Sequence, residues 1–260
     1  MVENDSEIGV EQGTPDGMGS PIKTPGADGI SQRVMDFFWL VDCSGSMDGR
    51  KIDSLNAAIR ECIPAIRQTR DAEPSKPPVM MRAISFSSGA QWHIAKASDV
   101  ATFQWTDLKD ASGVTDLGKA LELLAPELAA DKLPAHGLRP VILLVSDGKP
   151  TDDWRKGLQA LLAQPGGEKA VRAAVGISGG SGDEPDMDVL HEFMGGHNEL
   201  KPLLADNAVD LVRFMKWLST SLVKTSSTGS RDKKAAANVV VAQGQPKPTP
   251  HNQLKPGKVF

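Results

Sequence analysis

The chain has 260 residues, of which 40% are hydrophobic and 24% charged, and its formal net charge is -4 at pH 7. These values are typical of a folded globular protein, and the small negative charge argues against a surface for nucleic acid or anionic membranes. Cys43 and Cys62 are too few for a disulfide framework or a cysteine-based zinc site, which suits a reducing compartment. Because we find no signal segment and no run of about 18 apolar residues, we expect a cytoplasmic protein without membrane spans.

Two segments of low hydrophobicity flank a patterned centre. Residues 1–32 are rich in Gly, Pro, Asp and Ser, and residues 225–260 are rich in Ser, Lys, Pro and Gln. Such segments bury too little apolar surface to offset the entropy of ordering, which predicts a disordered N-terminal arm and a flexible C-terminal tail. Residues 238–242 within the tail form a short β-prone run that could pair with a sheet edge. Residues 33–224 are therefore predicted to form one domain.

Apolar runs alternate with segments of helical periodicity through this domain. Pro64 should kink or shorten the end of the first helix, because proline lacks an N–H and clashes with the preceding turn. Alternation of strands with helices predicts an α/β, doubly wound fold, with a mostly parallel central sheet and helices on both faces. In chain order the pattern predicts a strand at 34–41, a helix at 52–67, a strand at 79–85, an edge strand at 91–95, a helix at 116–130, a strand at 140–146, a helix at 152–163, a strand at 169–177 and a helix at 208–223.

Three loops that follow predicted strands carry oxygen-bearing side chains. The first reads Asp-Cys-Ser-Gly-Ser and places Asp42, Ser44 and Ser46 at alternate positions, which in an extended turn aims them in one direction. The second, Ser-Gly-Val-Thr, supplies the hydroxyl of Thr115, and the third supplies the carboxylate of Asp147 directly after the most apolar strand. Ligands of open α/β sheets bind at the carboxyl ends of the strands, so we expect these side chains to form one site.

This set of oxygen atoms favours a hard cation. Few carboxylates and several hydroxyls suit Mg²⁺, which prefers octahedral oxygen coordination and often keeps bound water, and Mn²⁺ or Ca²⁺ are alternatives. With Asp42 and Asp147 as the only carboxylates, the ion would keep much of its positive charge. A carboxylate from a second protein would then be attracted to an open position on the ion.

The Asp-x-Ser-x-Ser motif that begins at Asp42, with Thr115 and Asp147 downstream, resembles the metal-ion-dependent adhesion site of von Willebrand factor type A domains. The resemblance spans residues 34 to about 224 and implies a Rossmann-like fold. It also implies that the hydroxyls bind the ion directly, that some of the other ligands bind through water, and that an Asp or Glu of a partner protein completes the coordination. The family implies recognition without catalysis.

Further segments resemble the TerY-type subfamily of bacterial tellurite-resistance proteins. This resemblance implies a role as an adaptor in a bacterial stress-response or phosphorylation-signalling system. The partners it implies are a Ser/Thr protein kinase and a metal-dependent protein phosphatase. Some relatives carry a cysteine-rich zinc segment at the C-terminus, whereas this chain has no cysteine after Cys62. The segments that carry the resemblance are residues 112–118, 147–157 and 214–222.

Several other residues have structural interpretations. Thr115 could cap the helix that follows it, a role compatible with binding an ion. Asp152 and Asp153 are expected in the first turn of a helix, where carboxylates interact favourably with the helix dipole. Trp92 and Trp154 could face a partner or pack beneath loops. The remaining polar candidates are expected to be structural or exposed: Asp48, His191 and His197.

Two other functions stay open beside the interaction module. A metal-dependent hydrolase or phosphoryl-transfer enzyme could also use a carboxylate after the first strand of an α/β fold. Against this, Ser44 stands where a phosphoaspartate-type enzyme needs a second Asp, and the chain has no phosphate-binding loop that ends in Lys-Ser or Lys-Thr. The third possibility is a scaffold in which the metal site is purely structural.

Overall fold

The structure is a computed structural model that describes residues 33–73, 77–109, 111–133, 137–179, 184–195, 201–227 and 246–247. Within these ranges, six strands form one sheet in the order β3-β2-β1-β4-β5-β6. Only the β2–β3 pair is antiparallel. The predicted α/β, doubly wound fold with a mostly parallel sheet is confirmed. The strands are β1 (Met35–Asp42), β2 (Val79–Ser87), β3 (Gly89–Asp99), β4 (Val141–Ser146), β5 (Val171–Ile177) and β6 (Leu203–Ala205).

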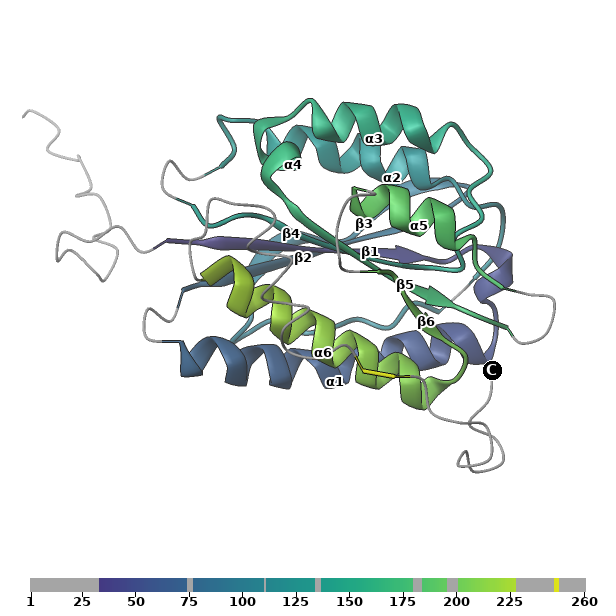
Figure 1. The fold of residues 1–260 in the computed structure, drawn as a ribbon, viewed down its shortest axis with the longest axis horizontal. Coiled ribbons are helices and arrows are strands. Elements are labelled where there is room, and N and C mark those ends of the chain that lie inside the picture. Colours follow the sequence, from purple (N-terminus) through teal and green to yellow (C-terminus); the bar gives the residue numbers. More distant parts are fainter. Residues whose placement is uncertain are drawn as a thin grey trace, which may run out of the picture. The chain divides into compact units, whose positions relative to one another are not determined.

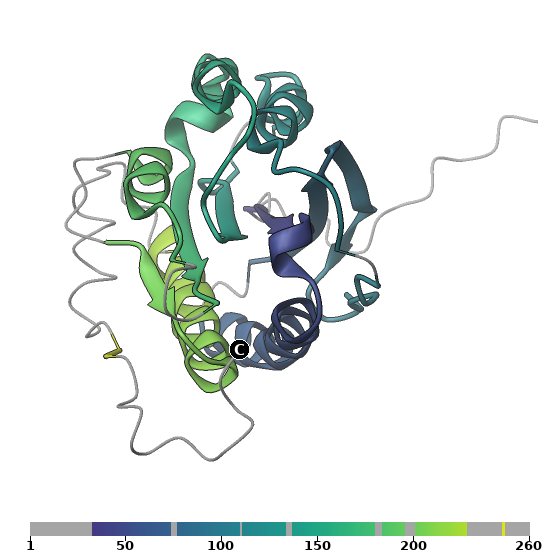
Figure 2. The ribbon, with the colours of Figure 1, turned by 90° about the vertical axis from the view of Figure 1, so that its right-hand side faces the viewer.

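Helices cover both faces of the sheet (Figure 1). α1 (Arg50–Ala72) and α6 (Ala208–Ser227) pack against each other on one face. Figure 2 shows the same two layers from the end at which the parallel strands finish. The other face carries four shorter helices, α2 (Leu117–Leu124), α3 (Trp154–Leu162), α4 (Pro165–Lys169) and α5 (Met187–Met194). Two 3₁₀ turns complete the described elements, η1 (Gly45–Met47) after β1 and η2 (Ala125–Leu128) after α2.

The centre of the sheet is buried on both sides. Every residue of β4 is buried, and the aromatic side chains of Phe37, Phe38 and Trp39 in β1 are at most 1% exposed. A continuous run of large apolar side chains fits a strand that is covered by helices on both faces. The carboxyl ends of β1 and β4 are therefore held in fixed positions beside each other, since Val41 pairs with Val145.

The first helix is longer than predicted. α1 runs through Pro64 and continues to Ala72, so the expected shortening at this proline is wrong. Pro64 lies on the exposed side of the helix, whereas Ile63 and Ile66 beside it are buried in the core. Burial of the apolar side stabilises the helix beyond the one backbone hydrogen bond that the proline removes.

Other boundaries differ for local reasons. The helix predicted at 116–130 ends at Leu124, because Pro126 starts the tighter turn η2. Residue 169, where a strand was expected to start, ends the short helix α4, and the strand β5 starts at Val171. The elements α4, α5 and β6 were not predicted. The edge strand predicted at 91–95 is found as β3, which is longer and runs antiparallel to β2. The N-terminal arm and the run 238–242 lie outside the described residues.

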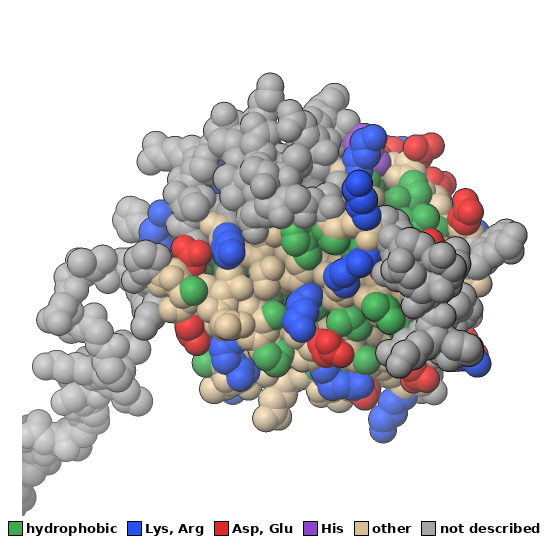
Figure 3. Space-filling model, turned by 60° about the horizontal axis from the view of Figure 1, so that its bottom comes forward, with side chains coloured by type: hydrophobic (Ala, Val, Ile, Leu, Met, Phe, Trp, Pro, Cys, Tyr) green, Lys and Arg blue, Asp and Glu red, His purple; other side chains and the backbone are tan. Residues whose placement is uncertain are grey.

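The outer face of α1 and α6 is mixed in character. Figure 3 shows basic side chains spread among acidic and hydrophobic ones on this face. One pair joins the two helices, Lys216 to Glu61, with 3.8 Å between the nitrogen and the oxygen. None of the helices in the described ranges has the length and apolar character needed to cross a bilayer.

Candidate metal site

The three predicted loops meet at the carboxyl end of the sheet. Asp42 is the last residue of β1, and Asp147 directly follows the neighbouring strand β4. The Thr115 loop is joined to the first loop by backbone hydrogen bonds, from Ser112 N–H to the Cys43 carbonyl (2.9 Å) and from Gly45 N–H to the Gly113 carbonyl (3.1 Å). Residues that are far apart in the chain thus share one end of the fold.

The carboxylate of Asp42 is held by groups of this chain. Asp42 is fully buried, and its Oδ1 accepts a hydrogen bond from the backbone N–H of Ser44 at 2.8 Å. Its Oδ2 accepts a bond from the hydroxyl of Ser146 at 2.5 Å. Burial raises the pKa of Asp42 to about 6, with a further contribution from the negative charge of Asp147, although the hydrogen bonds from Ser146 and Ser44 act in the opposite direction. The side chain is therefore fixed in position, and its charge costs free energy.

The carboxylate of Asp147 has no such partners. The residue is 1% exposed, and neither carboxylate oxygen accepts a hydrogen bond from the described part of the chain. A buried carboxylate without donors costs several kcal/mol unless another charge compensates it. Asp42 is a second acidic group close enough to interact with it. Two acidic groups are thus buried near each other, and both oxygens of Asp147 lack hydrogen-bond donors from the described residues. A bound cation would compensate both charges.

The hydroxyl groups fit the same ion. The Oγ atoms of Ser44 and Ser46 lie 3.0 Å apart. Two oxygen ligands at right angles around an ion, each about 2.1 Å from it, lie about 3.0 Å from each other, so the separation matches adjacent positions of an octahedral Mg²⁺ site. Thr115 is 6% exposed and its side chain makes no hydrogen bond with the described residues. The donor set therefore fits a hard divalent cation.

Nitrogen- or sulfur-rich coordination has no basis in the described ranges. No group of three or more His, Cys, Asp or Glu side chains in them is arranged to hold an ion. Both cysteines are buried, and burial raises the pKa of the Cys43 and Cys62 thiols to about 12. The thiols are therefore protonated at neutral pH and are poor metal ligands.

Side chains from other loops tie the site together. Asp116 accepts hydrogen bonds from the backbone N–H of Gly89 (2.8 Å) and from the hydroxyl of Thr151 (3.3 Å). Thr151 in turn accepts from the N–H of Thr115 at 3.1 Å and donates its own N–H to the Thr115 carbonyl at 2.8 Å. This network joins the β2–β3 turn, the Thr115 loop and the loop after β4, and it fixes the backbone of Thr115.

The expectations for the starts of two helices are wrong. Asp116, and not Thr115, occupies the position before α2, and its side chain does not cap that helix. The N-terminal N–H groups of α2 instead bind Asp152 from the loop after β4, with 3.0 Å from Gly118 and 3.0 Å from Lys119. Asp152 therefore stabilises a different helix from the one it precedes. Asp153 is the N-cap of α3 and accepts a hydrogen bond from the N–H of Lys156, so neither aspartate lies in the first turn of this helix, where both were expected.

The tryptophans pack rather than face outward. Trp154 is 5% exposed, and the Arg155 guanidinium lies 4.7 Å from its ring centre. Trp92 is partly buried against the core, with the Arg82 guanidinium 5.0 Å away. His191 lies in α5 without a place in the site, and His197 lies outside the described residues.

Ser146 is a site residue that the sequence reasoning missed. Its hydroxyl donates to Asp42 and accepts from the backbone N–H of Gly148 at 2.9 Å, so it links the two loops that carry the carboxylates. The signal was present, because Ser146 stands at the end of the most apolar strand, where a polar side chain needs a partner.

No protein-family model matches the chain, and no curated protein matches it in sequence. Its fold is similar to that of a von Willebrand factor type A protein from Catenulispora acidiphila (14% identity, TM-score 0.53, 74% of this chain and 43% of the other). The fold is also similar to that of VWA2, an ArnB paralog of Sulfolobus acidocaldarius (15% identity, TM-score 0.51, 72% of this chain and 46% of the other). A third similar structure is the PilB minor pilin of Streptococcus sanguinis (16% identity, TM-score 0.54, 80% of this chain and 64% of the other). The chain thus spans less than two thirds of each of these structures, and it has the fold of von Willebrand factor type A domains.

Proposed function

We propose that this chain is a non-enzymatic interaction module that binds a partner protein through a divalent cation. The observation that carries the proposal is the buried carboxylate of Asp147, which has no hydrogen-bond donor among the described residues and lies near Asp42. Asp42, Ser44, Ser46, Thr115 and Asp147 would hold the ion, with Mg²⁺ as the first choice and Mn²⁺ or Ca²⁺ as alternatives.

The partner would contribute a carboxylate. Two carboxylates balance the formal charge of a divalent ion, and the three hydroxyls are weak neutral ligands, so an Asp or Glu from outside would bind at a coordination position that otherwise holds water. Ser46 is exposed, so the site opens to solvent on this side. Val114, beside Thr115, is 47% exposed and offers an apolar contact next to the ion. The residues on this edge thus combine charge recognition with a small hydrophobic surface.

The groups around the site support binding more than catalysis. Ser44 occupies the position at which a phosphoaspartate-type enzyme needs a second Asp. The Cys43 thiol next to the site, with a pKa of about 12, is no nucleophile at neutral pH. A metal-dependent hydrolase remains the alternative, and turnover of a phosphoester by the purified chain that is lost in Asp147→Ala would establish it.

The finer biological role follows from the TerY-type resemblance. We place the chain in a bacterial stress-response, tellurite-resistance or phosphorylation-signalling system, where a Ser/Thr protein kinase and a metal-dependent protein phosphatase are the candidate partners. The support is the sequence of the segments 112–118 and 147–157, both of which contribute loops to the candidate site.

A pull-down from the native cell tests the proposal. The full chain is the bait, in Mg²⁺ and in EDTA, and retained proteins are identified by mass spectrometry. Asp147→Ala removes a carboxylate that makes no hydrogen bond with the described residues, and Asp131→Ala, an exposed acidic residue before β4, is the matched control. We expect partners to be lost in EDTA and in Asp147→Ala and kept in Asp131→Ala. Retention in both EDTA and Asp147→Ala would favour the scaffold with a structural metal site.

A further inference from the structure

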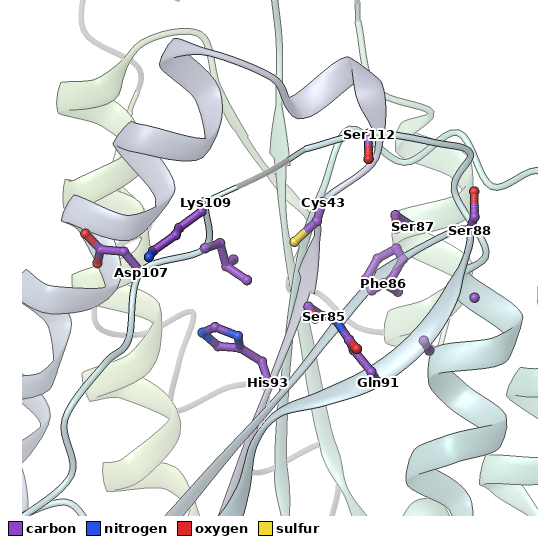
Figure 4. Close-up of a pocket in the computed structure, with 13 residues that line it drawn as sticks. Cys43, Ser85, Phe86, Ser87, Ser88, Gln91, His93, Asp107, Lys109 and Ser112 are labelled. Atoms are coloured by element: carbon purple, nitrogen blue, oxygen red, sulfur yellow. The ribbon is translucent and has the colours of Figure 1, made fainter.

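A polar pocket opens beside the candidate metal site. It has a volume of about 410 Å³ and lies between the β2–β3 turn and the segment 107–112 (Figure 4). Cys43 and Ser112, which belong to two of the metal-site loops, form part of its lining, and the sulfur of Cys43 points into it. Pockets of about 300 to 1,000 Å³ are typical of binding sites. The pocket is therefore large enough for a side chain of a second protein.

Polar side chains form much of the lining of this pocket, and several of them can donate hydrogen bonds. Lys109 is exposed, and its ammonium group makes no ion pair with the described residues. The His93 Nε2 donates to the carbonyl of Thr106 at 2.6 Å, which fixes the ring. Figure 4 shows Lys109 and His93 on one side of the pocket and Ser88 and Ser112 on the other. A ligand with acceptor oxygens and a negative charge fits this lining.

The acidic residue at the pocket does not oppose such a ligand. Asp107 lines the pocket, but its carboxylate forms an ion pair with Arg60 of α1. This pair leaves Lys109 as the uncompensated charge among the described lining residues. An anionic side chain is therefore favoured over a cationic one.

The pocket is connected to the metal-site loop. The Ser88 hydroxyl oxygen accepts a hydrogen bond from the N–H of Val114 at 3.2 Å, which leaves its own proton available to a ligand. Gly113 permits this approach, because a Cβ at that position would lie 2.3 Å from the Ser88 Oγ. The pocket and the Thr115 loop are therefore joined by a direct contact.

We propose that this pocket is a second recognition site, which binds an acidic side chain of the same partner segment whose first carboxylate binds the ion. This inference rests on the proposed function, and it names the partner chemistry as a segment with two acidic residues. The ion would bind the first carboxylate, and the ammonium group of Lys109 would bind the second.

The test uses the full chain and fluorescently labelled Gly-Ser peptides in Mg²⁺, with affinity measured by fluorescence anisotropy. One peptide carries a single Glu, a set carries a second Glu two to five residues later, and a matched set carries Lys at those later positions. We expect at least one peptide with two Glu residues to bind about three- to tenfold more tightly than the single-Glu peptide. EDTA should remove the binding of both.

Lys109 variants assign the gain to the pocket. Lys109→Ala should remove the gain of the second Glu and leave the single-Glu affinity unchanged, and Lys109→Arg should keep most of the gain. Lys96→Ala, an exposed lysine on β3 outside the pocket lining, is the matched control and should change neither affinity.

Four results would overturn the inference. The second site is rejected, and the proposed function stays intact, if a second Lys rather than a second Glu increases the affinity. The same holds if the single-Glu peptide shows EDTA-sensitive binding but a second Glu increases the affinity at no spacing. Lys109-dependent binding of inorganic phosphate in EDTA would assign the pocket to a free anion instead. If no peptide shows EDTA-sensitive binding, the proposed function and the inference both fail.

Discussion

The two loops that carry the carboxylates differ in how far the chain itself satisfies them. In the loop after β1, Asp42 accepts hydrogen bonds from the Ser44 backbone and the Ser146 hydroxyl. In the loop after β4, Asp147 is buried to nearly the same degree, yet its carboxylate accepts none from the described residues. The chain itself supplies hydrogen-bond donors to the carboxylate of the first loop, whereas the carboxylate of the second loop needs a ligand to compensate its charge.

This difference separates structural from functional roles among residues of the same type. Hydrogen-bond donors offset part of the cost of burying the Asp42 charge, whereas the Asp147 charge has no such donors among the described residues. Free energy lost in this way is regained when a cation binds, because binding to the folded state alone stabilises it. Removing a hydrogen-bond donor to Asp42 and removing the charge of Asp147 should therefore have opposite effects on the metal-free protein.

The largest expected effect is that of the ion itself. Mg²⁺ at about a thousand times its dissociation constant should raise the free energy of unfolding by about 4 kcal/mol relative to EDTA. Asp147→Ala should remove this increment, because it removes a ligand, and Asp131→Ala should keep it. Urea denaturation of each protein in the two buffers measures the increments. An equal increment in Asp147→Ala would show that Mg²⁺ acts elsewhere.

The next effect is a pH dependence that comes from Asp42. Its pKa rises from 3.8 to about 6 in the folded protein, so the unfolded chain releases this proton first as pH increases. A pKa shift of one unit corresponds to about 1.4 kcal/mol. In EDTA the free energy of unfolding should therefore fall by about 3 kcal/mol between pH 4 and 6 and stay constant at higher pH. Asp42→Asn should flatten this slope. An unchanged slope in Asp42→Asn would remove Asp42 as its source.

Single substitutions in each loop of the metal-free protein should change its stability in opposite directions. In EDTA, Asp147→Asn should stabilise the protein by about 1 to 3 kcal/mol, because it removes a buried charge that has no described donor. Ser146→Ala should destabilise it by a similar amount, because it takes a donor from buried Asp42. Thermal denaturation gives both signs. A loss of stability in Asp147→Asn would mean that the carboxylate has a stabilising partner.

The smallest effect concerns the two neighbouring aspartates after β4. Asp152→Ala should destabilise the protein by about 1 kcal/mol, since it takes the cap from α2, and Asp153→Ala should cost about the same through α3. Only Asp152→Ala should weaken Mg²⁺ binding, because Asp152 joins the loop after β4 to the helix that follows Thr115. Equal Mg²⁺ affinities in the two variants would contradict this.

Local patterns in the sequence were sufficient to predict the central strands of the sheet and the loops that carry the candidate site. The continuous apolar runs at β1 and β4 predicted the central strands, and the alternate spacing of Asp42, Ser44 and Ser46 predicted a common direction. These features depend on residues close together in the chain. The short elements α4 and β6 contain too few residues to show a period, so they were missed. In α5 the buried residues Val189, Leu190, Phe193 and Met194 do recur at helical spacing, and this pattern was overlooked.

Contacts between distant residues could not be predicted in the same way. Asp152 caps α2 across 34 residues of chain, and Ser146 donates to Asp42 across 104, and neither is visible in a local pattern. The continuation of α1 past Pro64 depends on packing against the core, which a helix propensity does not include. The pocket beside the site likewise needs the β2–β3 turn and the segment 107–112 to be placed together.

The most direct test of the central claim is a Mn²⁺ titration of the metal-free full chain, followed by electron paramagnetic resonance of the free ion. We predict that the Asp42–Asp147 site binds one Mn²⁺ per chain, that Mg²⁺ displaces it, and that Asp147→Ala loses it while Asp131→Ala keeps it. No bound Mn²⁺, or equal binding in Asp147→Ala, would contradict a cation site at the carboxyl end of this sheet.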